Sequence, residues 1–388
     1  MELDSFVNDC IEKEVFPGCQ IAVAYKGDLI HHKAYGHHDY TKLQAVQLTD
    51  LYDLASLTKI LATTISMMRL YEDGFINVND KISKYIPELE ETKISEISIA
   101  RLMTHTAGFK AWIPFYRDFM KEENVTNYFS PVKSERFDNQ VIDGFYCLTS
   151  VGDTIMKIIA DTDLNKRNRY LYSDFGFIIL PKLIENVVMM NFEEFLNLCF
   201  YNKMGLRTMV YNPLKVFSKD EIMPTELDKD FRKTLVQGYV HDQAAALLGG
   251  VSGHAGLFAN AYDVAVIGQM LLNGGHVNGV RYFEKSTVDY FTSRFQLTAS
   301  NHRRGLGFDR RVAGETDNGP CTLLASQKSY GHTGFTGTYL WVDPEYDLAF
   351  VFLSNRINPN AENRGISKYK VRAEIHKLIY LAIKNRGK

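Results

Sequence analysis

The chain has 388 residues, of which 45% are hydrophobic and 23% charged, and its formal net charge at pH 7 is -2. A chain of this length can bury a sizeable core, and it carries no long run of Lys and Arg that would neutralise a row of phosphates. Its apolar stretches, such as FIILPKLIENVVMM, are broken by charge or proline well short of the roughly 18 residues that a membrane span requires. Composition therefore argues against nucleic acid as a partner and against a membrane span.

The first predicted elements gather near the two ends of the chain. Residues 2–15 have the pattern of an amphipathic helix that ends near Pro17-Gly18, and CQIAVAYKGDLIHHKAYG then alternates around Lys26-Gly27-Asp28, which predicts a β-hairpin. The segment TGTYLWVDPEYDLAFVFLSN predicts a second hairpin that turns at Asp343-Pro344, and a helix follows from about 369 to 383. Strands are thus predicted at both termini.

The middle of the chain has a mainly helical pattern, with irregular polar segments around 120–140 and 212–234. Hairpins from opposite ends of a chain must bury their apolar faces, so we expect one antiparallel sheet built from both termini, with the terminal helices on one face. The predicted fold class is α/β of the α+β type, with approximate subdomains 1–60 plus 305–388 for the sheet and terminal helices, and 61–304 for a mainly helical region. A helix after Ser56 would lie at the seam between them, where clefts tend to form.

Cysteines and the N-terminus give weaker information. The five cysteines include no C-x-x-C pair, so we expect all of them to be free and structural: Cys10, Cys19, Cys147, Cys199 and Cys321. The start MELDSFVNDC shows no basic-then-apolar leader. We therefore expect either a cytoplasmic protein or a trimmed piece of a longer one.

An S-x-x-K motif occurs three times, at Ser56-Lys59, Ser130-Lys133 and Ser367-Lys370. The last two lie in polar surroundings, whereas Ser56 opens TKILATTISMMRLYEDG, in which apolar residues recur at helical spacing until Gly74. Residues three apart on a helix are neighbours, so Ser56 and Lys59 are predicted to point the same way. One interpretation is a helix cap beside a solvated lysine. The other is a nucleophile whose proton a buried lysine accepts.

Two further segments contain residue types that occur in active sites. In RYLYSDFGFIIL, residues 169–180, a tyrosine, a serine and an aspartate precede an apolar helix, and Ser173 or Asp174 would also fit as a simple cap. In YGHTGFTGTYLWVDP, residues 330–344, glycines recur beside a strand. They indicate either close approach of another group to the backbone or a bulge.

The order SLTK, YSD, HTG resembles the three boxes S-x-x-K, S-D-N and K-T-G of serine β-lactamases and penicillin-binding proteins. The chain is most similar to the branch with Y-x-N as its second box, which contains class C β-lactamases, D,D-peptidases and related esterases. LMTHTAGF, GGVSGHAGLFANAYDVA and RRGLGFD also resemble that branch. The resemblance implies a single β-lactamase-like catalytic unit over residues 1–388, with no cofactor and no metal.

The resemblance also implies roles for single residues. Ser56 would be the acylated nucleophile, Lys59 its proton acceptor and Tyr172 the general base, provided that neighbouring cations stabilise the phenolate. In the other register of the second box, Ser173 would replace Tyr172.

The oxyanion hole would be formed by the backbone N–H groups of Ser56 and Phe335, on an edge strand. Gly334 would leave room for the substrate to approach, and His332, Thr333 and Asp174 would contact it.

Two positions depart from the family pattern. Asp174 stands where an Asn would donate to the substrate, and it can instead pair with Lys59 and hold it charged. His332 replaces the usual Lys, so a fixed positive charge is lost unless Arg303 or Arg304 restores it. Both changes argue against an efficient β-lactamase.

Three other motifs are given structural roles. Ser252 lacks the glycine that a G-x-S-x-G elbow needs at position 254, so GGVSGHAG is predicted to be a loop lining the cleft. The histidines of HHKAYGHHDY lack zinc-ligand spacing and are predicted to lie at an exposed strand end, and His105 is predicted to be a structural hydrogen-bonding residue.

The expected activity is metal-free acyl transfer to water on D-alanyl peptidoglycan peptides or related D-amino-acid amides and esters. The alternatives are a promiscuous small-ester esterase, a weak β-lactamase, or a non-catalytic module that binds muropeptides or β-lactams. The chain is also similar to serine hydrolase domains attached to secreted β-N-acetylglucosaminidases, which implies a possible glycoside hydrolase domain in the full-length protein. That setting would be the bacterial periplasm or cell envelope, with a leader or upstream domain outside this chain.

Overall fold

The computed structural model describes residues 2–165, 169–297, 302–312 and 319–386. Its largest sheet has six strands in the order β13-β14-β15-β16-β1-β2, and all neighbouring pairs are antiparallel. The N-terminal hairpin joins the C-terminal one through β1 and β16, in a register that runs from Cys19 opposite Ser354 to Tyr25 opposite Leu348. The predicted sheet built from both termini is confirmed. Its strands are β1 (Gly18–Tyr25), β2 (Asp28–Gly36), β13 (Asp309–Arg310), β14 (Tyr330–Thr333), β15 (Tyr339–Asp343) and β16 (Leu348–Ser354).

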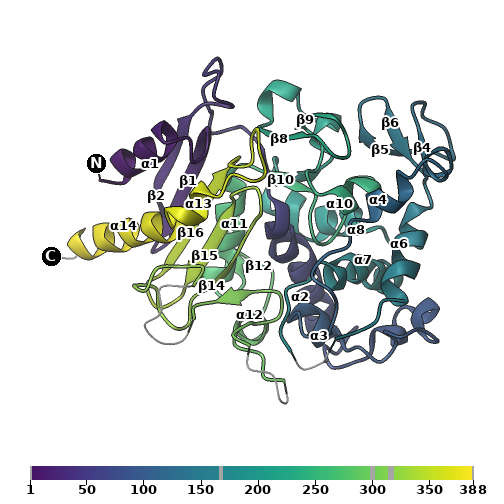
Figure 1. Cartoon of the computed structure of the whole chain (residues 1–388). Helices are drawn as coiled ribbons and strands as arrows, with labels where there is room; N and C mark the ends of the chain where they lie inside the picture. Colours follow the sequence, from purple (N-terminus) through teal and green to yellow (C-terminus); the bar gives the residue numbers. More distant parts are fainter. Residues whose placement is uncertain (1, 166–168, 298–301, 313–318, 387–388) are drawn as a thin grey trace.

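Both faces of this sheet are covered by helices (Figure 1). Side chains alternate between the faces of a strand, so Phe350 and Phe352 of β16 join one apolar cluster while Val351 and Leu353 join another. The terminal helices α1 (Glu2–Glu12) and α14 (Val371–Arg386) pack on the first face, and α11 (Ala261–Leu272) packs on the second. The helix predicted over residues 2–15 ends at Glu12, and the one predicted from 369 begins at Val371.

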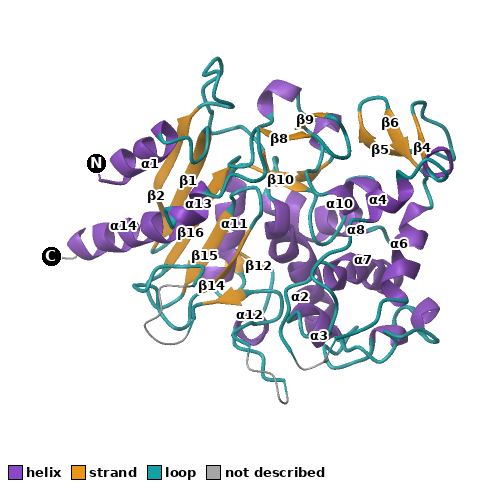
Figure 2. Cartoon of the chain, viewed as in Figure 1, coloured by secondary structure: helices purple, strands orange, loops and turns teal. Residues whose placement is uncertain are grey.

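The rest of the chain forms a helical region beside the sheet, as the secondary-structure colouring shows (Figure 2). Its helices are α2 (Ile65–Glu72), α3 (Ile99–Met103), α4 (Phe115–Phe119), α5 (Val125–Tyr128), α6 (Val151–Ala160), α7 (Phe175–Val188), α8 (Phe192–Leu196), α9 (Asn202–Met204), α10 (Gln243–Leu247) and α12 (Lys285–Thr292), and α13 (Gly365–Lys368) precedes α14.

The polar segments predicted to be irregular contain short strands. One small sheet has the order β4-β6-β5, and β8 pairs with β9. These strands are β4 (Phe129–Ser130), β5 (Asn139–Ile142), β6 (Phe145–Cys147), β8 (Pro224–Asp228) and β9 (Thr234–Gln237). Their mixed sequences lack the clean alternation that marks a half-buried strand.

The segment after Ser56 is not the single α-helix that its periodicity predicts. Ala55–Leu57 forms a 3₁₀ turn, Lys59–Thr64 a π-helical segment, and only Ile65–Glu72 a regular α-helix. Every residue of the π-helical segment is buried. π-helical turns are rare and occur frequently at functional sites.

A third small sheet holds the start of this segment in place. Its order is β3-β10-β7, from β3 (Tyr52–Asp53), β10 (Leu257–Ala259) and β7 (Val210–Tyr211), and a separate hairpin joins β11 (His276–Val277) to β12 (Val280–Arg281). Because β3 ends three residues before Ser56, this sheet fixes the approach of the chain to that serine.

Among the described residues, no single helix is both long and apolar enough to cross a membrane, and only the bent pair Phe175–Val188 and Phe192–Met204 passes that test jointly. All five cysteines lie within the described ranges and are free, as predicted.

Candidate active site

The structure brings Ser56, Lys59 and Tyr172 together. The Oγ atom of Ser56 lies 2.9 Å from Lys59 Nζ and 3.0 Å from the hydroxyl of Tyr172. Ser56 and Lys59 come from the 3₁₀ and π-helical segments, and Tyr172 from the loop just before α7. The other register of the second box does not fit this geometry, because Ser173 is buried and its Oγ accepts from the Phe175 N–H.

Lys59 is surrounded by acceptors. Its Nζ donates to Ser56 Oγ, to the carbonyl of His254 at 3.1 Å, and to Asp174 Oδ1 at 2.7 Å. Burial alone would lower the pKa of Lys59, but the charge of Asp174 leads the effects that oppose burial, its hydrogen bond to Nζ adds to them, and the pKa lies above its ordinary value. Lys59 is therefore an ammonium ion in the resting site, with three acceptors for its three protons.

Tyr172 is a neutral phenol in the resting site. Burial raises its pKa, and the opposing effect of the Lys59 charge does not overcome it. Among the groups around the ring, the guanidinium of Arg304 lies 5.3 Å from its centroid and the ring of His105 lies 4.4 Å from it. His105 itself is held by a 2.9 Å hydrogen bond from Nδ1 to the Ser173 carbonyl. That contact is the structural hydrogen bond predicted for His105.

The turn after β14 carries the candidate oxyanion donor of Phe335. Two threonine hydroxyls of this turn donate to the backbone just before Ser56, from Thr336 to the Asp53 carbonyl at 2.7 Å and from Thr338 to the Leu54 carbonyl at 2.8 Å. These bonds hold the turn against the segment that positions the Ser56 N–H.

The third box shows two details beyond the expectations. A Cβ atom at Gly334 would lie 1.9 Å from Thr338 Oγ1 and 2.6 Å from the Leu54 carbonyl, so packing within the protein already requires a glycine here, independently of the approach of substrate. The strand is also not the edge of the sheet. β13 lies outside β14 but pairs only with Tyr330 and Gly331, which leaves the edge open from His332 onward.

His332 points to Arg304 rather than into the cleft. Arg304 Nη1 lies 3.1 Å from His332 Nε2, and a guanidinium can only donate, so the imidazole proton is on Nδ1, which donates to the Thr333 carbonyl. Burial, followed by the charges of Arg304 and Lys59, lowers the pKa of His332 well below its ordinary value. Of the two arginines considered, Arg304 thus places a charge beside Tyr172, while Arg303 pairs with Asp309.

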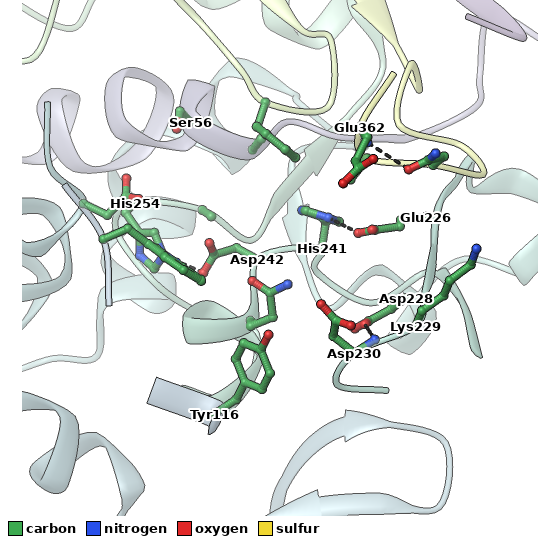
Figure 3. A pocket seen from close by; sticks show the side chains of 18 of the residues that line it. Ser56, Tyr116, Glu226, Asp228, Lys229, Asp230, His241, Asp242, His254 and Glu362 are labelled. Atoms are coloured by element: carbon green, nitrogen blue, oxygen red, sulfur yellow. Dashed lines mark hydrogen bonds and ion pairs between the residues drawn. The ribbon is translucent and has the colours of Figure 1, made fainter. Parts of the chain in front are cut away.

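A cleft of about 790 Å³ opens in front of Ser56. Ser56, Tyr172, Asp174 and Phe335 line it, whereas His332, Thr333 and Gly334 are not among its lining residues. Its walls are acidic, because the described lining residues include six carboxylates but only two arginine or lysine side chains, Arg117 and Lys229. In the view of Figure 3, Asp242 and His254 lie between Ser56 and Tyr116, and Glu226, Asp228 and Asp230 lie across the cleft. The carboxylates are Asp174, Glu226, Asp228, Asp230, Asp242 and Glu362.

Sequence reasoning missed a hydrogen-bonded network around α10, in which Asp242 precedes the helix and Ser252 and His254 follow it. His254 Nε2 donates to Asp242 Oδ1 at 2.8 Å, and its Nδ1 lies 2.8 Å from Ser252 Oγ. Ser252 is buried and has no access to substrate, as expected from the rejected elbow motif. These hydrogen bonds instead orient His254, whose carbonyl accepts a hydrogen bond from Lys59 Nζ. The nearness of Asp242 and His254 in sequence was the only available signal.

Phe335 also has neighbours that the sequence did not indicate. Its ring stacks on His241 with centroids 5.4 Å apart, and the guanidinium of Arg356 lies 4.8 Å from the ring centroid. His241 is in turn hydrogen-bonded to Glu226. The side chain of Phe335 thus forms part of the cleft wall.

No group of His, Cys, Asp and Glu side chains within the described ranges has the arrangement of a metal site. In HHKAYGHHDY, His38 is buried and bonded to Asp50 at 2.7 Å rather than exposed at a strand end.

Comparisons with known proteins agree with this geometry. A family model described as Beta-lactamase matches residues 3–373. The chain belongs to the β-lactamase family. A curated relative in this family, the "Putative D-alanyl-D-alanine carboxypeptidase" of Salmonella agona, is 33% identical over 402 residues, which cover 94% of this chain and 86% of the relative.

Two solved structures share the fold of this chain. A class C β-lactamase has a TM-score of 0.67 at 16% identity and covers 96% of each chain. EstCE1, described as a hydrolase with promiscuous acyltransferase activity, also has a TM-score of 0.67 at 16% identity, over 94% of this chain and 95% of its own. Family membership and the curated relatives make the chain a serine hydrolase with a β-lactamase-like fold.

Proposed function

We propose that the chain hydrolyses D-alanyl peptides derived from the bacterial cell wall, through an acyl-enzyme on Ser56. The observation that carries this proposal is the contact of Ser56 Oγ with both Lys59 Nζ and the Tyr172 hydroxyl at the base of a cleft large enough for a peptide. The relatives named as D-alanyl-D-alanine carboxypeptidases support the substrate class. We propose that the protein acts in the bacterial cell envelope, where substrates of this class occur.

The proton path begins at Asp174 because Lys59 is charged at rest. Asp174 Oδ1 takes a proton from Lys59 Nζ, and the neutral amine then takes the proton of Ser56 as Oγ attacks the substrate carbonyl carbon. The oxygen that gains negative charge accepts hydrogen bonds from the N–H groups of Ser56 and Phe335.

Tyr172 completes the acylation step. Its hydroxyl donates a proton to the leaving nitrogen of D-alanine, the carbon–nitrogen bond breaks, and Lys59 returns a proton to the phenolate. A water molecule that loses its proton to the same pair then attacks the ester on Ser56, and the carboxylic acid product leaves with Oγ reprotonated. Arg304 stabilises the transient phenolate, since its charge lies beside the ring.

A second candidate function is hydrolysis of small esters. It is favoured by the acidic wall of the cleft and by the burial of His332, because none of the described lining residues beside Ser56 is a cation that would bind a C-terminal carboxylate. Among the described residues that line the cleft, the two arginine and lysine side chains, Arg117 and Lys229, come from α4 and from the turn between β8 and β9.

The test compares the purified chain with its S56A variant. We expect release of free D-alanine from an acetylated D-alanyl-D-alanine peptide, and a mass increase on Ser56 after incubation with benzylpenicillin, both lost in S56A. The matched control is S367A, which removes the serine of an exposed S-x-x-K motif. An intact S56A activity would contradict the proposal. Turnover of p-nitrophenyl acetate without release of D-alanine would favour the esterase.

A further inference from the structure

The peptide unit between Gly334 and Phe335 joins the candidate oxyanion donor to a carbonyl that an arginine contacts. Its N–H is the candidate oxyanion donor, and its C=O belongs to Gly334. Arg372, in the first turn of α14, donates from Nη2 to this carbonyl at 2.6 Å. One end of this amide group is thus the candidate oxyanion donor, and Arg372 binds the oxygen at its other end.

A hydrogen bond to an amide oxygen makes the N–H of the same amide a better donor. Amide resonance moves electron density from nitrogen to oxygen, and a donor at the oxygen stabilises the form in which nitrogen is more positive. Charge-assisted bonds are the stronger kind. Burial, followed by the charge of Arg356, lowers the pKa of Arg372 to about 10, so the guanidinium is still charged near neutral pH.

The surroundings of Arg372 give it no other obvious purpose. Its Nε is buried without a hydrogen-bond partner, and within the described part of the chain no carboxylate forms an ion pair with it. A partly buried cation of this kind costs folding free energy. The helix does not need it as an anchor, because apolar residues already attach α14 to the sheet: Val371, Ile375, Ile379 and Tyr380.

The Gly334 carbonyl does not need Arg372 either. It already accepts from the Gly337 N–H at 3.2 Å, which closes the turn. A purely structural account therefore leaves both partners of the Arg372–Gly334 bond unexplained.

We propose that Arg372 is a positioning residue of the oxyanion hole, which polarises and orients the Phe335 N–H from the far side of the turn. The proposal rests on the function proposed above, since it requires that a substrate oxygen receive that N–H. Arg372 does not line the cleft, so it acts on the reaction only through this peptide. The C-terminal helix, which lies against α1 on the outer face of the sheet (Figure 1), would thereby contribute to the chemistry of Ser56.

The test uses R372M and R372K, with K377M as the matched control. Lys377 is an exposed cation on the same helix whose ion pair is with Glu374. For an activated ester we expect kcat of R372M to fall about tenfold with KM nearly unchanged, a partial recovery in R372K, and no change in K377M. The fall is smaller than the hundredfold or more expected for removing an oxyanion donor outright, because the N–H itself remains.

Two further readouts separate polarisation from a loss of folding. The infrared stretch of the acyl carbonyl on Ser56 should move to higher frequency in R372M, because a weaker N–H donor polarises that carbonyl less. The affinity for a phenylboronic acid, which forms a tetrahedral adduct on the serine, should fall in parallel with kcat.

The outcomes are distinguishable from failure of the proposed function. If the wild-type Ser56 is not acylated by the ester, the proposed function itself is contradicted. If Ser56 is acylated and R372M keeps the wild-type kcat and carbonyl frequency, the role of Arg372 is overturned while the proposed function stands. A rise in KM with unchanged kcat would also overturn it, since it would indicate substrate binding.

Discussion

Asp174 decides the resting charge of Lys59. The family pattern has an amide at this position, whereas the carboxylate here forms a 2.7 Å ion pair with Lys59 and helps to raise the pKa of its ammonium. We predict that D174N lowers the pKa of Lys59, because burial then acts with less opposition. Because an amide cannot take the proton that Asp174 accepts from Lys59, kcat/KM of D174N at pH 7 should fall, and it should rise with pH as the amine becomes neutral.

The measurement is a pH–rate profile on an ester substrate from pH 5 to 9. D230N serves as the control, because Asp230 also lines the cleft but is not among the groups that shift the pKa of Lys59. A D174N profile that coincides with the wild-type profile would contradict this account of the second box.

Replacing His332 by the family's lysine should destabilise the chain. His332 Nε2 accepts from Arg304 at 3.1 Å, so an ammonium there would face a buried guanidinium. We expect H332K to lower the free energy of unfolding by about 3 kcal/mol. The double variant H332K/R304M should recover most of this loss, because Asp309 keeps Arg303 as its partner.

Urea denaturation at pH 7 measures both effects. H276K is the matched control, since it makes the same substitution at an exposed strand position. Equal urea midpoints for H332K and H276K would contradict the prediction, because the contact between His332 and Arg304 would then not make a lysine unfavourable at position 332.

At the scale of elements, the loop after α10 is packed tightly on the π-helical segment. A Cβ atom at Gly253 would lie 2.4 Å from the Phe177 carbonyl and 2.5 Å from Thr63 Oγ1. We predict that G253A shifts this loop, costs about 2 kcal/mol of stability and slows acylation, because the neighbouring His254 carbonyl moves away from Lys59.

G152A is the control. Gly152 lies within α6, where alanine is favoured over glycine, and an added Cβ atom would meet only the Leu248 side chain, at 3.4 Å. Stability from urea denaturation and the acylation rate would be measured for both variants. A G253A variant with wild-type stability and rate would show that the loop does not constrain Lys59.

The 3₁₀ and π-helical turns around Ser56 could not be predicted from the sequence. The periodicity of the apolar residues correctly predicted a buried helical segment after Ser56, but a π-helical turn has no periodic signal of its own over six residues. Its form depends on long-range bonds, such as the one from Thr63 Oγ1 to the Gly253 carbonyl at 2.7 Å. Helical spacing predicted that Lys59 approaches Ser56, and the resemblance of the second box to the family implied the same for Tyr172. Neither predicted the Asp242–His254 pair or Arg372, whose effects pass through backbone carbonyls.

For the whole molecule, alternation and turn residues predicted the two hairpins, and the need to cover their apolar faces predicted their union in one sheet. The second face was not foreseen, because α11 comes from the middle of the chain and its pattern does not say which surface it covers. The short strands β4–β6 and β8–β9 were also missed, because their sequences lack a clean alternation of apolar and polar residues. Their pairing is a property of the packed molecule rather than of local sequence.

The packing of α14 on the sheet should make the whole molecule sensitive to acid. His376 is buried among the rings of Tyr339, Phe350 and Tyr380, and burial lowers its pKa from 6.5 to about 3. Between these two pH values the unfolded chain binds a proton that the folded chain does not, so stability falls as pH decreases through this window. One such proton contributes about 1.4 kcal/mol per pH unit.

We predict that H376N reduces the acid slope of stability by about one proton. The amide does not titrate, and its oxygen can still accept the hydrogen bond that the Tyr339 hydroxyl gives to His376 Nδ1 at 3.3 Å. Urea midpoints at pH 7, 6 and 5 would show the difference, with H276N as the exposed control. The slope should not vanish, because His105 and His332 are also buried with lowered pKa values and bind protons on unfolding. An H376N slope equal to that of the wild type would mean that the helix and sheet separate, or admit water at His376, before the molecule unfolds.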